Sequence, residues 1–128
     1  MKLLLDTHSF LWFLSGDDRL SLTARNAITD PESRVWISAA GLWEIAIKAS
    51  LGKLKLGQPF DDLIPRQLAL NSIDVLNIEL GHLATVGRLP FHHRDPFDRL
   101  LAAQSLVEDL SIVSLDPAFD AYGVERIW

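Results

Sequence analysis

Four acidic residues, far apart in the chain, stand at places where a fold could bring them together. Asp6 and Asp116 each follow a short apolar run, and Asp98 stands near the start of a helical pattern. Glu44 lies in a largely apolar helical stretch, where a buried acid needs a partner or a metal ion. Carboxylates gathered within a few ångströms cannot all stay ionised without cations, and hard oxygen ligands favour Mg²⁺ or Mn²⁺. Because such ions activate water and stabilise charge on phosphate, the pattern predicts metal-dependent phosphodiester hydrolysis.

The stretch 95–104 carries the clearest local signal. Asp95 suits the N-cap of a helix and Pro96 its first position, which places Asp98 in the first turn. Both acids also have a purely structural interpretation, because negative charge is stabilised near the positive end of the helix dipole. We expect Asp95 to cap the helix and Asp98 to project toward the edge of a sheet.

Structural explanations are open for the other three acids as well. Either Asp6 or Thr7 is suited to cap a following helix, and Asp116 precedes a proline in the same way. Glu44 stands four residues before Lys48, which is the favourable order for an ion pair on a helix surface. For Asp6 and Asp116 these local patterns favour neither the cap nor the ligand.

Other site chemistries are absent from the sequence or poorly placed in it. The chain has no cysteine, which excludes a disulfide or a thiolate metal site. It has no glycine-rich phosphate loop, which disfavours a nucleoside-triphosphate site. His8, His92 and His93 are scattered, and we expect them to lie at the surface or to contact substrate rather than to bind a metal ion.

The length of 128 residues predicts a single domain, residues 1–128, with a sizeable core. The net charge of −5 argues against a protein that coats nucleic acid with a basic surface, although bound cations would reverse the field around clustered acids. The first residues carry too short an apolar run for a signal peptide, and no later run is long enough to span a membrane. Together with the lack of cysteine, these features favour a cytoplasmic protein.

Short apolar runs alternate with helical periodicity along the chain. An apolar run without alternation is typical of a parallel strand buried on both faces. Strands that alternate with helices imply right-handed crossovers, a mostly parallel sheet and a ligand site at the carboxyl ends of the strands. The expected strands are 2–5, 34–37, 72–76, 111–115 and 124–128, and the expected helices are about 7–14, 21–29, 39–51, 60–70, 79–86 and 96–109.

The blocks at 3–8, 38–48, 95–104 and 114–116 resemble the ordered motifs of PIN domains, most closely those of VapC-like toxins of bacterial toxin–antitoxin pairs. The resemblance covers essentially the whole chain, and the joint spacing of the blocks is specific. It implies a three-layer α/β fold with a central, mostly parallel sheet flanked by helices. It also implies a Mg²⁺- or Mn²⁺-dependent endoribonuclease acting on RNA, an antitoxin partner that covers the site, and a homodimer. The family's acidic quartet, which binds metal and carries catalysis, falls on Asp6, Glu44, Asp98 and Asp116.

Six further residues are candidates for supporting the acids or contacting substrate. Ser114 matches a small hydroxyl residue that the family has two places before the last acid. Gly41 stands where a serine is typical of the subgroup, a departure that bears on a substrate contact there and not on metal binding. The six candidates are Thr7, Ser38, Lys48, Asp95, Arg99 and Ser114.

Two alternatives share parts of this pattern. A response-regulator receiver domain has a similar length and an acidic Mg²⁺ pocket, but it needs adjacent acids after its first strand, an aspartate after its third and a late lysine. Here Asp6 stands alone, the third strand ends at Leu76-Asn77, and no lysine follows Lys55. The other alternative is a non-catalytic PIN-like binding module, against which the intact quartet argues.

Overall fold

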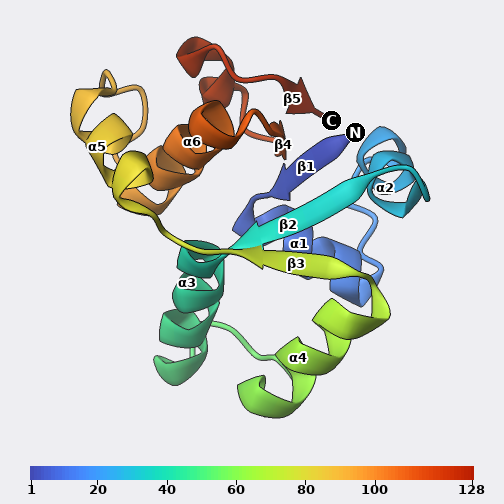
Figure 1. Ribbon diagram of the computed structural model, residues 1–128. Helices are drawn as coiled ribbons and strands as arrows, with labels where there is room; N and C mark the ends of the chain where they lie inside the picture. The colour runs from blue at the N-terminus through green and yellow to red at the C-terminus, as the bar shows by residue number, and fades with distance from the viewer.

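Five parallel strands form one central sheet in the computed structural model, which describes residues 1–128 (Figure 1). The strands are β1 (Lys2–Leu5), β2 (Arg34–Ser38), β3 (Ile73–Leu76), β4 (Ser111–Val113) and β5 (Arg126–Ile127). They lie in the order β3-β2-β1-β4-β5, which confirms the predicted parallel sheet. Receiver domains have the order 2-1-3-4-5, so the receiver interpretation is wrong.

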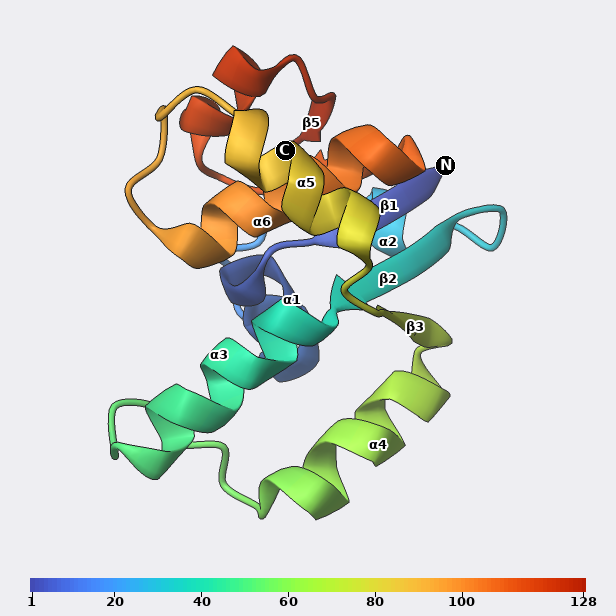
Figure 2. The same ribbon diagram turned by 60° about the vertical axis from the view of Figure 1, so that its left-hand side comes forward.

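Helices cover both faces of this sheet and make the predicted three layers. Helices α5 and α6 lie on one side, and α1, α3 and α4 lie on the other (Figures 1 and 2). The bounds are α1 (Thr7–Ser15), α2 (Leu22–Thr29), α3 (Ala39–Ser50), α4 (Phe60–Leu70), α5 (Leu80–Arg88) and α6 (Pro96–Glu108), followed by a 3₁₀ helix, η1 (Pro117–Tyr122). None of these helices combines the length and the apolar character needed to cross a membrane.

The central strand β1 is buried on both faces, which explains its uniformly apolar sequence. Successive side chains of a strand point to opposite faces. Leu3 and Leu5 therefore join a core with Phe10 of α1. Leu4 joins a second core on the other face, with Leu101 of α6. All five side chains are at most 2% exposed, so substitutions here would disrupt both layers.

Three strand ends carry a residue that caps the following helix. The side chains of Asp6, Ser38 and Asp116 each accept a hydrogen bond from a backbone N–H of the next turn, at 2.8, 3.1 and 2.9 Å. Because β1, β2 and β4 run parallel, these caps lie at the same edge of the sheet. Capping and placement at the predicted site therefore coincide, and the two interpretations of Asp6 and Asp116 do not exclude one another.

The start of α6 packs against α3 beside this edge. Asp95 Oδ1 accepts a hydrogen bond from Phe97 N at 2.8 Å, which confirms Asp95 as the cap. The rings of Phe97 and Trp43 make an edge contact with their centroids 5.5 Å apart. Since these rings directly precede Asp98 and Glu44 in the sequence, the contact holds the helices of both acids together.

Candidate active site

Asp6 and Glu44 are held by short hydrogen bonds from neighbouring helices. Asp6 is 9% exposed, and its Oδ1 is engaged by Ser9 N. Glu44 Oε1 accepts a hydrogen bond from the Thr7 hydroxyl at 2.6 Å, and its Oε2 pairs with Lys48 Nζ at 3.0 Å. The expected Glu44–Lys48 pair is therefore present, but the Glu44 side chain is only 12% exposed, so it is not a solvated surface pair. Thr7 and Lys48 both position Glu44.

Asp98 is the acid whose ionisation the site opposes. Burial is the largest cause that raises the pKa of Asp98, to about 7 from 3.8. The negative charges of Asp95, Asp6 and Glu44 raise this pKa further, while His93 acts in the opposite direction. The carboxyl group is therefore close enough to the other acids to feel their charge, and a nearby cation would stabilise its ionised form.

The pKa of Asp116 is lowered, in contrast to that of Asp98. Burial by itself would raise the pKa of Asp116, but hydrogen bonds from Ala118 N and His93 outweigh it and lower the pKa. Oδ1 accepts from Ala118 N at 2.9 Å, and Oδ2 lies 2.9 Å from His93 Nε2. Ser114, which is fully buried, accepts a hydrogen bond from Asp116 N at 3.0 Å. Ser114 thus shapes the backbone at Asp116.

His93 is the site residue that sequence reasoning missed. It is 8% exposed, so the expected surface position is wrong for it, whereas His8 and His92 are exposed as expected. His93, Asp98 and Asp116 each offer one atom that could bind a metal ion, and these three atoms lie within 4.8 Å of one another. No spacing rule could reveal this, because the contact joins residues 23 positions apart and depends on the path of the loop before α6.

The guanidinium of Arg99 donates its hydrogen bonds to the backbone of the chain. It is 7% exposed, and its nitrogens donate to the backbone oxygens of Pro90, Val86 and Leu89 at 2.9, 3.0 and 3.3 Å. Of the two roles expected for Arg99, these hydrogen bonds favour support of the site over contact with substrate. Arg99 ties the end of α5 and the following loop, which carries His93, to the start of α6.

Ser38 also has a local role. Its hydroxyl caps α3, and the residue is fully buried. Gly41 in the first turn of this helix allows a close approach to α1: an added β-carbon would lie 3.2 Å from Ile37 Cδ1 and 3.4 Å from Thr7 Oγ1. The absence of a side chain at Gly41 thus leaves room for the Thr7 hydroxyl that binds Glu44.

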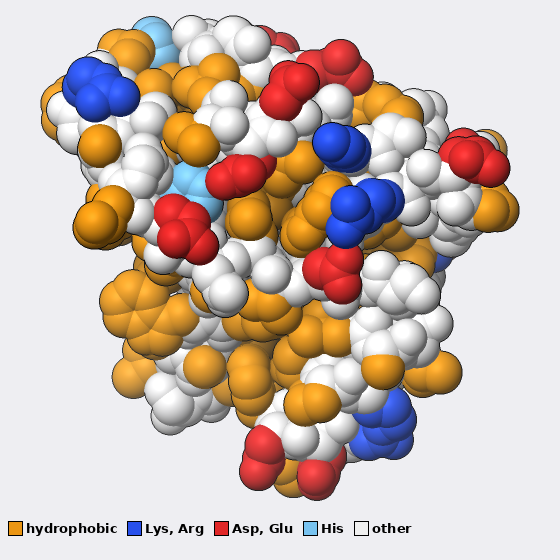
Figure 3. Space-filling view, viewed as in Figure 1, with side chains coloured by type: hydrophobic (Ala, Val, Ile, Leu, Met, Phe, Trp, Pro, Cys, Tyr) orange, Lys and Arg blue, Asp and Glu red, His pale blue; other side chains and the backbone are white.

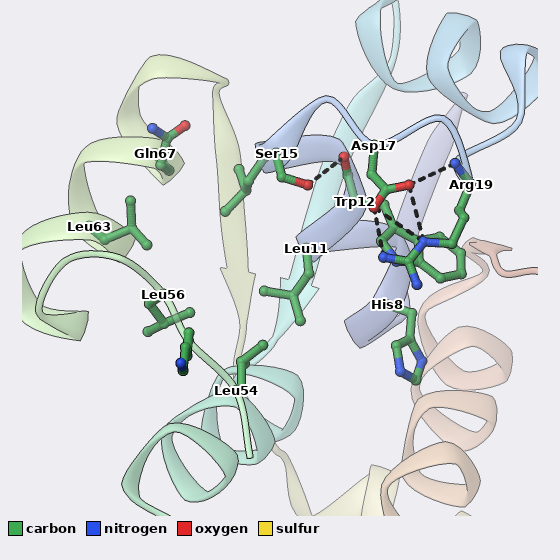
Figure 4. Close-up of a pocket in the computed structure, with 12 residues that line it drawn as sticks. His8, Leu11, Trp12, Ser15, Asp17, Arg19, Leu54, Leu56, Leu63 and Gln67 are labelled. Carbon is green, nitrogen blue, oxygen red and sulfur yellow. Dashed lines mark hydrogen bonds and ion pairs between the residues drawn. The ribbon is translucent and has the colours of Figure 1, made fainter. Parts of the chain in front are cut away.

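A separate hollow in the molecule is an apolar groove between α1, the segment after α3, and α4 (Figure 4). Leu11, Leu54, Leu56 and Leu63 line it, and none of the four acids does. The ion pair of Arg19 with the carboxylate of Asp17, 2.7 Å long, lies at its margin. The acidic site is therefore distinct from this groove.

The sequence matches the model of the PIN domain over residues 3–125. The chain belongs to the PIN domain family. This confirms the predicted family, and the shared parallel sheet agrees with it. No curated protein sequence matches the chain significantly.

Solved structures share the fold of this PIN domain. VapBC2 from Rickettsia felis, bound to a promoter DNA fragment, is 14% identical, with both chains fully covered and a TM-score of 0.73. VapBC-1 from nontypeable Haemophilus influenzae is 15% identical, covering 98% of this chain and 96% of its own, with a TM-score of 0.65. A toxin–antitoxin complex from Klebsiella pneumoniae is 17% identical, covering 89% and 86%, with a TM-score of 0.58. The matches support the resemblance to VapC-like toxins at the level of the fold.

The donor set of this PIN domain fits a hard divalent cation. Carboxylate oxygens predominate, and they are the ligands that Mg²⁺ and Mn²⁺ prefer. The raised pKa of Asp98 indicates that burial and the neighbouring negative charges are not compensated by the chain's own cations. The one lysine in contact, Lys48, is already paired with Glu44. A divalent cation would supply the missing positive charge.

Proposed function

We propose that this PIN domain is a Mg²⁺- or Mn²⁺-dependent endoribonuclease and the toxin of a toxin–antitoxin pair. The observation that carries the proposal is the convergence of acids at one sheet edge. A carboxylate oxygen of Asp98 and one of Asp116 lie within 4.8 Å of each other, and Asp6 and Glu44 are near enough to raise the pKa of Asp98. Capping explains why Asp6 and Asp116 lie at this edge, but it does not explain why Glu44 and Asp98 are partly buried beside them.

The four acids share one task in this proposal. Asp6, Glu44, Asp98 and Asp116 would hold the cation. The cation would supply activation of water and stabilisation of the charge that develops on the phosphate. The cap hydrogen bonds fix one oxygen of Asp6 and one of Asp116, and Thr7 with Lys48 fixes Glu44. The chain thus holds its carboxylates in place before a ligand arrives, which limits the reorganisation that binding requires.

Exposed aromatic side chains beside the acids support a single-stranded nucleic acid as substrate. Trp43 is 62% exposed, stands directly before Glu44, and contacts Phe97, which stands directly before Asp98. Aromatic side chains stack on unpaired bases without regard to sequence. Lysines and arginines form no continuous patch on the face viewed in Figure 3, where acidic and basic side chains are interspersed. Stacking and a bound cation would therefore supply much of the affinity for a polyanion.

The partners proposed for this chain are an antitoxin and a second copy of the chain. The supporting observation for the antitoxin is the fold shared with chains of toxin–antitoxin complexes. Exposed apolar residues, among them Leu80 at 84% and Phe91 at 87%, provide surface that association would bury. Light scattering of the purified chain tests the homodimer, and co-expression with the product of a neighbouring short reading frame tests the antitoxin.

The deciding experiment is cleavage of a single-stranded RNA by the purified chain with Mg²⁺, with Mn²⁺ and with EDTA. We expect cleavage only with a metal ion, and none for Asp6→Asn or Asp98→Asn, whose amides keep the shape but lose the charge. Asp18→Asn is the matched control, because Asp18 is exposed and remote from the acids. Undiminished cleavage in EDTA would refute the metal-dependent mechanism, and an absence of cleavage under all conditions would favour the non-catalytic binding module.

A further inference from the structure

We propose that His93 is a positioning residue: its imidazole donates a hydrogen bond from Nε2 to Asp116 Oδ2 and is not itself a metal ligand. The inference rests on the proposed function in taking Asp116 as part of a metal site. The Nε2–Oδ2 distance is 2.9 Å. Together with the bond from Ala118 N to Oδ1, it restrains both oxygens of the Asp116 carboxylate.

The His93 ring is fixed by its surroundings. It lies parallel to the ring of Tyr122, with an interplanar angle of 7° and ring centroids 5.4 Å apart. The centroid of the Phe119 ring lies 4.5 Å from that of His93. The backbone N–H of His93 donates to the Tyr122 hydroxyl at 2.9 Å. Since both aromatic residues belong to η1, directly after Asp116, the ring and the carboxylate are attached to the same short element.

The two ring nitrogens of His93 have different environments, and this difference places a proton on Nε2. Nε2 faces a carboxylate, which only accepts hydrogen bonds when ionised. Nδ1 is buried and has no hydrogen-bond partner. If the ring carried a proton on Nδ1 alone, that N–H would be buried with no acceptor, and Nε2 would have no hydrogen to give to Asp116. Nε2 therefore carries a proton.

The same observation argues against His93 as a ligand. A histidine that binds a metal through Nε2 carries its proton on Nδ1, and metal-binding histidines almost always donate that second N–H to a carboxylate, a carbonyl or water. Nδ1 of His93 meets none of these in the chain. A donating role at Nε2 requires no such partner.

Holding Asp116 matters because its side chain is 44% exposed and, without His93, only the hydrogen bond from Ala118 N would restrain it. Loss of a group that orients a metal ligand typically lowers metal affinity about 10–100-fold. We therefore expect His93→Phe, which keeps an aromatic ring against Tyr122 but cannot donate, to bind Mn²⁺ about 10–100-fold more weakly in calorimetry. His93→Gln offers an amide N–H near the position of Nε2 and should restore most of the affinity. His92→Phe, at the exposed neighbouring position, is the matched control.

Nitrogen-15 NMR of the unsubstituted protein, without and with saturating Mg²⁺, tests the assignment without any variant. We expect Nε2 of His93 to carry a proton in both states. An Nε2 without a proton in the metal-free protein, or loss of the Nε2 proton when Mg²⁺ binds, would overturn the inference. A folded His93→Phe with undiminished Mn²⁺ affinity would also overturn it. None of these measurements uses RNA, so a failure of cleavage would count against the proposed function and not against the role of His93.

Discussion

Neutralising Asp98 is expected to stabilise the metal-free protein at neutral and alkaline pH while abolishing activity. In the folded chain the pKa of Asp98 is about 7, against 3.8 for an unperturbed aspartate, with burial as the largest cause. Between these two values the folded state binds more protons than the unfolded state. Stability must therefore fall as pH rises from about 4 to about 7 and become constant above that, because ∂ΔG/∂pH follows the difference in bound protons.

The size of the effect follows from the same pKa. A difference of one pKa unit corresponds to about 1.4 kcal/mol, so full ionisation costs the metal-free fold at most about 4 kcal/mol. Asp98 is only partly buried, and solvent screening reduces this cost, so we expect about 2 kcal/mol. Asp98→Asn removes the titration and should recover that amount at pH 8. For a chain of this length, this corresponds to a rise in melting temperature of roughly 8 °C.

The assay is urea unfolding of the unsubstituted protein and Asp98→Asn from pH 4 to pH 8 in EDTA. The free-energy difference between them should grow with pH across this range. Asp18→Asn, at an exposed position, should show no such trend. With saturating Mg²⁺ the order should reverse, because binding to the folded state stabilises only the protein that holds the ion. A difference independent of pH, or a less stable Asp98→Asn at pH 8 in EDTA, would refute the reasoning.

Three further substitutions have expected effects on stability. Asp116→Asn should destabilise by about 1 kcal/mol at pH 7 in urea unfolding, because the carboxylate accepts two hydrogen bonds. Since the pKa of Asp116 is lowered, this loss should vanish as pH falls through that pKa, below the ordinary range of an aspartate, and a stabilised variant would contradict the prediction. Arg99→Met should lower the free energy of unfolding by about 3 kcal/mol in the same assay, because three backbone oxygens lose their hydrogen-bond donor. A loss smaller than that of a surface substitution would show that water replaces the guanidinium as donor. Gly87→Ala should stabilise the protein by about 0.5–1 kcal/mol in thermal melts, because an added β-carbon there meets no atom within 4 Å. Gly41→Ala should stabilise it less or destabilise it, because the added β-carbon would press on Ile37. Equal gains at both glycines would contradict the close approach of α1 and α3.

Local patterns along the chain were sufficient to predict most of the fold. The apolar run before Asp6 predicted a buried strand, and the pair Asp95-Pro96 predicted the start of a helix; both are observed. These signals are readable because strand burial and helix caps depend on residues within about four positions of one another. The placement of acids at strand ends also followed, since parallel strands share an edge.

The tertiary structure alone decided which partners these residues have. His93 looked like an exposed histidine and is buried against Asp116, because the loop after α5 folds back onto η1. Arg99 was a candidate either for supporting the acids or for contacting substrate, and its guanidinium donates to the backbone at the end of α5. The contrast between Asp98 and Asp116, one with a raised and one with a lowered pKa, is equally invisible in the sequence. Burial and hydrogen-bond donors from distant segments set the ionisation of each carboxylate, and these depend on how the layers pack rather than on neighbours in the chain.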